Sequence, residues 1–136
     1  MPRIIQIPAD FRPLLTKCLL GVMHDAAEAL EQCGLDPECY PEPLEQFDAI
    51  RAVLDALGWG AVAEIDVDVH GDALHQGLSD RLATERHLYA DGVAAAEKGN
   101  PAGETQRDTA YGYACQLEAF MHTSGLPIPG AGERNG

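Results

Sequence analysis

Apolar residues recur at helical spacing along much of the chain, most clearly over residues 44–59. There Phe47, Ile50, Leu54 and Leu57 are separated by three, four and three positions, which places them on one face of a helix. Charged residues occupy the opposite face, so this segment is predicted to be an amphipathic helix with its apolar side against a core. The glycine that follows Leu57 predicts where the helix ends.

The same spacing predicts three further helices, at about 11–33, 72–98 and 104–123. Each is followed within two residues by a glycine, the residue most common just past a helix end. The connections after the first and third helices are short, as antiparallel neighbours require. The sequence therefore predicts an all-α fold, a four-helix antiparallel bundle.

Two short segments have the pattern of strands. Residues 3–7 are rich in β-branched side chains, and residues 64–70 alternate apolar with polar side chains, so that Ile65, Val67 and Val69 share one face. A ribbon of two strands is marginal unless it packs on other elements. We therefore expect at most a minor two-stranded β element, and the pattern leaves open whether the two segments pair.

A chain of 136 residues is typical of one domain. Because no long linker interrupts the helical segments, we expect a single helical domain over residues 1–126. Residues 127–136, PIPGAGERNG, are rich in proline and glycine and predict a flexible C-terminal tail.

The charge balance narrows the classes of partner. The chain has 22 Asp and Glu against nine Lys and Arg, a net charge of −13 with histidine neutral. Binding to nucleic-acid phosphates or to anionic membranes needs clustered basic residues, so we expect neither. A protein partner with a basic surface would be attracted. The N-terminus lacks the apolar run of a signal peptide, and we therefore expect a cytoplasmic location.

The four cysteines, Cys18, Cys33, Cys39 and Cys115, include no C-x-x-C pair, so no zinc ribbon or thioredoxin-type motif is predicted. Cys33 and Cys39 flank a turn and could reach each other. We do not expect a disulfide there, because nothing in the sequence marks the chain as secreted.

The best candidate for a metal site is the segment DVDVHGD, in which Asp66, Asp68, His70 and Asp72 alternate with other residues. Oxygen ligands at alternate positions before a turn are typical of the start of an EF-hand loop. The pattern fails at its twelfth position, where Gly77 stands in place of a bidentate glutamate. We favour the competing interpretation, a solvated strand that leads into a helix N-cap at Asp72, and we expect no cofactor.

Two histidine–carboxylate pairs have helical i,i+4 spacing, His24 with Glu28 and Glu118 with His122. They lie opposite or at the edge of the apolar stripes, which favours exposed pairs over metal ligands. The chain also lacks a G-x-S-x-G elbow and a glycine-rich phosphate loop. An enzymatic activity is therefore not expected.

Three residues are candidates for contacts with a partner: Leu14, Leu20 and Trp59. The leucines lie at the margin of an unusually wide apolar stripe, which serves a homodimer interface as well as a monomer core. Trp59 is the only tryptophan. We favour the interpretation in which it caps the core, because tryptophans are highly buried on average. The alternative is an exposed recognition anchor.

The leading prediction is a small acidic helical interaction or regulatory protein, an adaptor or accessory subunit, that contacts a basic protein partner or a second copy. One alternative is a bundle that binds a small ligand or a metal at DVDVHGD. That alternative needs polar side chains that point inward, and Glu85 is the one that interrupts an apolar stripe. The other is an acidic antitoxin-like or nucleic-acid-mimic inhibitor, which would show two rows of carboxylates on one face.

Overall fold

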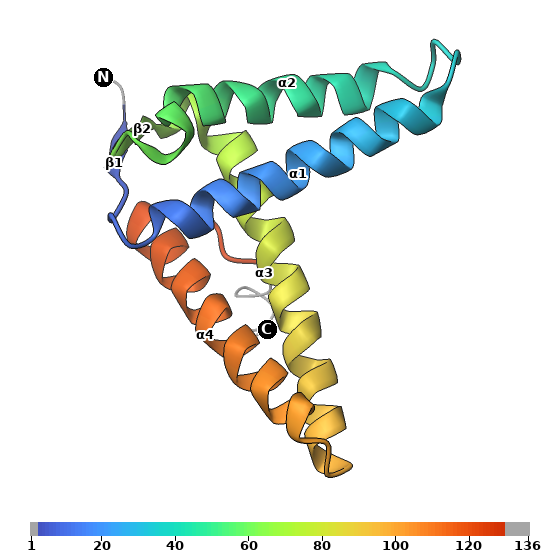
Figure 1. Cartoon of the computed structure of the whole chain (residues 1–136). Coiled ribbons are helices and arrows are strands. Elements are labelled where there is room, and N and C mark those ends of the chain that lie inside the picture. Colours follow the sequence, from blue (N-terminus) through green and yellow to red (C-terminus); the bar gives the residue numbers. More distant parts are fainter. Residues whose placement is uncertain (1–2, 130–136) are drawn as a thin grey trace, which may run out of the picture. The chain divides into compact units, whose positions relative to one another are not determined.

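The computed structural model describes residues 3–129, which form four helices and a two-stranded sheet (Figure 1). In chain order the elements are β1 (Ile4–Gln6), α1 (Arg12–Cys33), α2 (Pro41–Ala56), the 3-10 turn η1 (Gly58–Gly60), β2 (Glu64–Asp66), α3 (Val67–Glu97) and α4 (Pro101–Ser124). The predicted all-α class with a minor β element is confirmed.

The contacts divide the chain into two compact units, and the boundary falls within α3. Unit 1 ends at Leu78 and unit 2 begins at Ser79. The single domain that the sequence suggests stays a prediction. The predicted tail begins at residue 127, and its residues 130–136 lie outside the part of the chain that the structure describes.

Unit 1 is organised around an antiparallel hairpin of α1 and α2, which lie side by side (Figure 1). The apolar stripe that the sequence assigns to α2 supplies its core, because Ile50, Leu54 and Leu57 are almost fully buried. Leu15 and Leu19 on α1 are buried as well. Proline in the first turn starts α2, where its missing N–H would have had no helical partner.

Cys33 and Cys39 form a disulfide across the loop between α1 and α2, so the expectation of two free thiols there is wrong. The geometric reason is local. Helix α1 ends at Cys33, Gly34 adopts a positive φ of 59°, and the backbone N–H of Asp36 donates to the Cys33 carbonyl. This turn brings the two Cα atoms to 5.4 Å, within the usual range for a disulfide.

The two strand-like segments do pair, as antiparallel strands with Ile5 opposite Ile65. The second strand is shorter than the predicted 64–70, because it ends at Asp66 and the next residue begins α3. The Asp66 carboxylate accepts the backbone N–H of Asp68 at 2.9 Å, in the manner of a helix N-cap. Val69, which the alternation placed inward, is 70% exposed.

Unit 2 contains the rest of α3 and α4 as a second antiparallel hairpin (Figure 1). The Gln106 side chain donates to the Leu88 carbonyl, near the ends where the two helices connect. The backbones approach closely at two glycines. A Cβ added to Gly92 would lie 2.6 Å from the Arg107 nitrogen, and one added to Gly103 would lie 2.6 Å from the Ala95 Cβ. No side chain fits at either position.

We predict that the Cys33→Ser, Cys39→Ser double variant unfolds more easily. The disulfide closes a short loop and thereby lowers the entropy of the unfolded chain. Loss of the disulfide should therefore reduce the free energy of unfolding by about 2 kcal/mol. Urea denaturation of both proteins measures the difference. A thiol reductant should bring the wild type to the level of the variant and leave the variant unchanged, and equal stabilities without reductant would contradict the prediction.

Gly92→Ala and Gly103→Ala should each lower the free energy of unfolding. Alanine is the better helix former by about 1 kcal/mol, but a Cβ forced into backbone atoms of the other helix costs roughly 1–3 kcal/mol. Gly112→Ala on α4 is the matched control, because a Cβ there meets no atom within 4 Å. The control should gain roughly 0.5–1 kcal/mol. If thermal unfolding shows all three variants stabilised, the close packing is refuted.

Candidate functional site

The turn after α2 holds a tryptophan in a backbone conformation that bulky residues rarely adopt. Gly58, Trp59 and Gly60 have φ values of 56°, 54° and 104°. Within residues 3–129, Trp59 is the one non-glycine residue with a positive φ. The left-handed conformation costs an L-residue about 1–2 kcal/mol, whereas glycine adopts it freely. Such strain persists where the surrounding structure imposes it, most often at functional sites.

The Trp59 side chain is 50% exposed, so it does not cap the core as we favoured. Its indole Nε1 donates a hydrogen bond to the Asp55 carboxylate, one turn earlier, at 3.1 Å. The bond fixes the orientation of the ring and satisfies its one polar group. What remains in water is a rigid apolar surface of the kind that dominates protein interfaces.

A surface pocket of about 320 Å³ lies beside the indole. We call it the Trp59 pocket, and its lining comes from the N-terminal part of α1 and from η1: Ala9, Arg12, Pro13, Thr16, Trp59 and Gly60. Gly60 closes one side, since a Cβ there would lie 3.1 Å from the Thr16 hydroxyl. The lining combines an aromatic ring, a proline and a single formal charge.

That charge belongs to Arg12, which is half-buried. Its Nε donates to the Ile7 carbonyl at 3.3 Å, and no carboxylate among residues 3–129 pairs with it. Thr16 donates its hydroxyl to the Arg12 carbonyl at 2.9 Å and keeps its lone pairs available. The pocket therefore offers cationic N–H donors next to apolar surface.

The other two residues nominated for partner contacts lie elsewhere on α1. Leu14 is buried at 6% exposure, whereas Leu20 is 37% exposed. Neither lines the Trp59 pocket. Trp59 combines exposure with a place in the lining of this pocket. No local sequence pattern links Arg12 to Trp59, because the two residues lie far apart along the chain.

The segment nominated for metal binding starts at the end of β2 and continues into α3. Asp66 accepts the N–H of Asp68, and Asp68 accepts the backbone N–H of Arg3 at 3.1 Å. Among residues 3–129, no group of three or more His, Cys, Asp and Glu side chains is arranged to hold a metal. These two carboxylates therefore have identifiable roles in joining β1, β2 and α3, and metal binding at Asp66, Asp68, His70 and Asp72 stays a prediction.

Asp72 also lines an acidic groove in unit 1 that sequence patterns did not predict. The groove has a volume of about 290 Å³ between α2 and the start of α3, and its lining is Glu42, Glu45, Gln46, Ala49, Asp72, Ala73 and Gln76. Three carboxylates over two alanines would attract a long basic side chain, whose methylenes could cover the alanines.

The histidine–carboxylate pairs behave differently from each other. His24 and Glu28 lie 3.3 Å apart, and both are largely exposed, as favoured from the sequence. Glu118 pairs instead with Arg86, at 2.9 Å, and His122 is exposed. Arg86 also donates to the Pro129 carbonyl at 2.6 Å. None of these contacts builds a two-ligand site.

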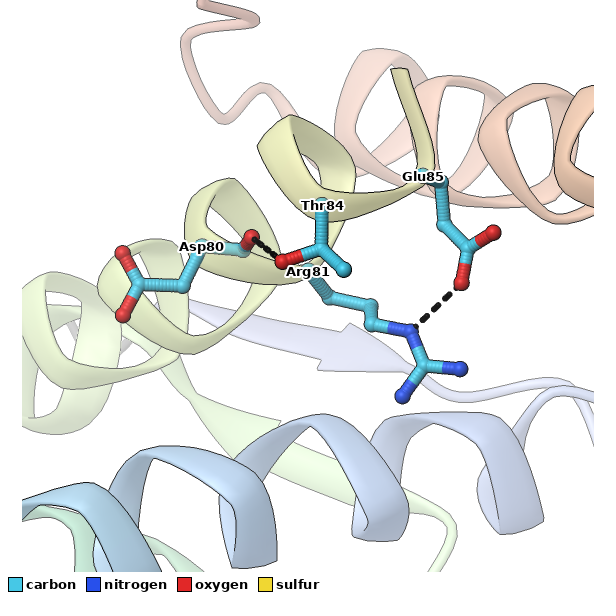
Figure 2. Close-up of polar contacts among 4 residues, drawn as sticks. All are labelled: Asp80, Arg81, Thr84 and Glu85. Atoms are coloured by element: carbon cyan, nitrogen blue, oxygen red, sulfur yellow. Dashed lines mark hydrogen bonds and ion pairs between the residues drawn. The ribbon is translucent and has the colours of Figure 1, made fainter. Parts of the chain in front are cut away.

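Unit 2 contains the buried charge that interrupts the apolar stripe (Figure 2). Glu85 is 3% exposed, and its Oε1 accepts from Arg81 Nε at 2.8 Å. The Arg81 guanidinium lies 5.8 Å from the centre of the Tyr113 ring, which is within cation–π distance. Removing one partner of such a buried pair typically costs about 3–5 kcal/mol. Glu85 thus has its partner inside the unit, which is a structural role.

An exposed aromatic patch lies on the α3–α4 hairpin of unit 2. The rings of Tyr89 and Tyr111 are 6.1 Å apart and tilted, and Tyr111 is 61% exposed. A hydrogen bond with the thiol of Cys115, one turn along α4, raises the pKa of the Tyr111 hydroxyl. Cys115 is free and exposed.

Acidic charge is concentrated in unit 1. Its sequence has 14 Asp and Glu against four Lys and Arg, a net charge of −10, whereas unit 2 has eight against five, a net charge of −3. Three of the four basic residues of unit 1 are Arg3, Arg12 and Lys17. Of these three residues, Arg12 lines the Trp59 pocket and is the one charged residue in its lining.

No protein-family model matches the chain, and neither the curated proteins nor the solved structures contain a match to it. Across the described residues, every helix is too short or too polar to cross a membrane.

We predict that glycine is more stabilising than alanine at position 59. Both substitutions remove the indole, and they differ only by a Cβ that is strained at a φ of 54°. Trp59→Gly should exceed Trp59→Ala by about 1 kcal/mol in free energy of unfolding. Leu20 on α1 is the control, where alanine should be better by about 1 kcal/mol. The same order at both positions in urea denaturation would rule out the left-handed turn.

Proposed function

We propose that this chain is a non-enzymatic helical interaction protein that binds a protein partner through the surface of unit 1 around Trp59. The observation that carries the proposal is the half-exposed tryptophan in a strained turn. The exposed half of the indole gains nothing from the core, and the backbone conformation of Trp59 opposes folding. A partner that covered the exposed half, roughly 100 Å² of apolar surface, would gain about 2–3 kcal/mol.

The charge of unit 1 favours a partner with a basic surface. A net charge of −10 attracts such a surface over long range, which raises the association rate more than the affinity. The acidic groove offers a place for one of its lysines or arginines. In this proposal the groove supplies steering and orientation, and Trp59 supplies most of the binding free energy.

The disulfide indicates the kind of cellular compartment in which the chain and its partner would be present. Disulfides persist in oxidising compartments and are rare in the cytosol. The Cys33–Cys39 bond therefore favours an oxidising compartment over the cytoplasmic location that we expected. A second copy of the chain, bound at the margin of the apolar stripe of α1 where Leu14 and Leu20 lie, stays an alternative partner, and the inhibitor hypothesis stays a prediction.

Site-specific photo-crosslinking tests the proposal in an extract of the source cells. A benzophenone amino acid at position 59, which replaces the indole with another large aromatic side chain, should still bind and form an adduct with one basic protein, and the yield should fall at high salt because salt screens the attraction. The same group at Leu35, which is 97% exposed, is the matched control and should give no such adduct. Identical adducts from both positions, or none from position 59, would contradict the proposal.

The purified pair then allows an affinity measurement. Trp59→Asn removes the indole, and asparagine tolerates a positive φ. Loss of an interface anchor costs about 2 kcal/mol or more, so the dissociation constant should rise about thirtyfold. Leu35→Ala should leave it unchanged.

A further inference from the structure

Among residues 3–129, no carboxylate forms an ion pair with the guanidinium of Arg12. In unit 2, by contrast, the arginines with ion pairs to carboxylates are Arg81, Arg86 and Arg107. Arg12 is half-buried, and the single hydrogen bond that its side chain makes within residues 3–129 uses Nε, which leaves both Nη groups available. A partly buried charge is stabilised by an opposite charge close to it. Unit 1 has 14 acidic residues, and none of those within the described chain supplies it.

The surroundings of Arg12 favour an anionic guest. Residues 11–24 contain Arg12 and Lys17 and no acidic residue, and Arg3 precedes them. Asp10, next in the chain to the lining residue Ala9, is exposed, and the Asp55 carboxylate already accepts the hydrogen bond of the Trp59 indole. Arg12 is therefore the one charged side chain that lines the pocket, although unit 1 as a whole is acidic.

The size and the rest of the lining restrict the guest further. A volume of about 320 Å³ is at the small end of ligand pockets. A pocket of this size accommodates a single residue of a partner rather than a helix. Trp59, Pro13 and Ala9 offer apolar surface, so the guest must carry an apolar group within a few bonds of its negative charge.

We infer that the Trp59 pocket receives the C-terminal residue of the protein partner. Its apolar side chain stacks on the indole, and its α-carboxylate accepts two N–H groups from the Arg12 fork. An aspartate or glutamate would bring the carboxylate without the apolar group, whereas a C-terminal residue carries both on one carbon. This inference rests on the proposed function and names the part of the partner that the Trp59 surface reads.

The test uses a hexapeptide, Gly-Ser-Gly-Ser-Gly-Phe, with a free C-terminus and again as its C-terminal amide. Because Trp59 is the only tryptophan, its fluorescence reports binding directly. The free acid should bind at least about tenfold more tightly than the amide, since a hydrogen bond between charged groups is lost. A peptide that ends in an amide and carries an internal aspartate should bind no better than the amide.

Two variants assign the effect to Arg12. Arg12→Met keeps an aliphatic side chain and removes the charge, so the acid and the amide should bind alike. Lys17→Met is the matched control, because it removes the same charge from α1 outside the pocket and should keep the preference within twofold. Arg12→Lys, which replaces the planar guanidinium with a point charge, should retain part of the preference for the free acid. Circular dichroism confirms that each variant is folded.

Equal binding of acid and amide to the wild type, no binding of either, or an equal loss in Arg12→Met and Lys17→Met would overturn the inference. The crosslinking experiment separates this failure from that of the proposed function. An adduct at position 59 without a preference for the acid would retain the partner and reject C-terminal recognition. A preference for the acid with no adduct would support a carboxylate pocket and reject the proposed partner.

Discussion

Unit 1 depends on one tight reversal of the chain, in which Gly58, Trp59 and Gly60 all have positive φ values. The turn ends α2 and returns the chain so that the Val62 N–H reaches the Leu57 carbonyl at 2.9 Å. The carbonyl of the next residue, Ala63, accepts the backbone N–H of Ile7, which links the turn to the strand pair. The conformation that exposes the indole is therefore the same one that joins the helical hairpin to the small sheet.

Most of the helical architecture follows from local pattern. The stripe of Ile50, Leu54 and Leu57 is buried as its spacing requires, because an amphipathic helix has one way to hide its apolar face. The strand prediction failed beyond Asp66, since alternating valine and aspartate suits a strand and also the first turn of a helix. The Asp66 carboxylate accepts the backbone N–H of Asp68 and so favours the helix. A period-two pattern of apolar residues carries no information about this hydrogen bond.

The candidate site was only half visible in the sequence. The average burial of tryptophan predicts a Trp59 that caps the core, whereas the structure leaves it 50% exposed in a turn with a positive φ. Arg12 joins it through tertiary packing, for which a linear pattern carries no signal. The disulfide prediction is wrong for a different reason. It rests on the cellular compartment, whereas the glycine turn after Cys33 is the local feature that brings the two cysteines together.

Two kinds of unusual side-chain environment occur in the chain: one is explained by a partner within the same unit, and the other is not. Glu85 is a buried charge, yet Arg81 neutralises it within the same unit, so nothing outside the chain is needed to explain it. Trp59 and Arg12 differ, because half of the indole is exposed to solvent and no carboxylate among residues 3–129 pairs with the half-buried guanidinium. Both line one pocket. A single guest that carries an apolar group beside a carboxylate would cover the ring and neutralise the cation together, and this coincidence supports the proposal of a partner at the pocket.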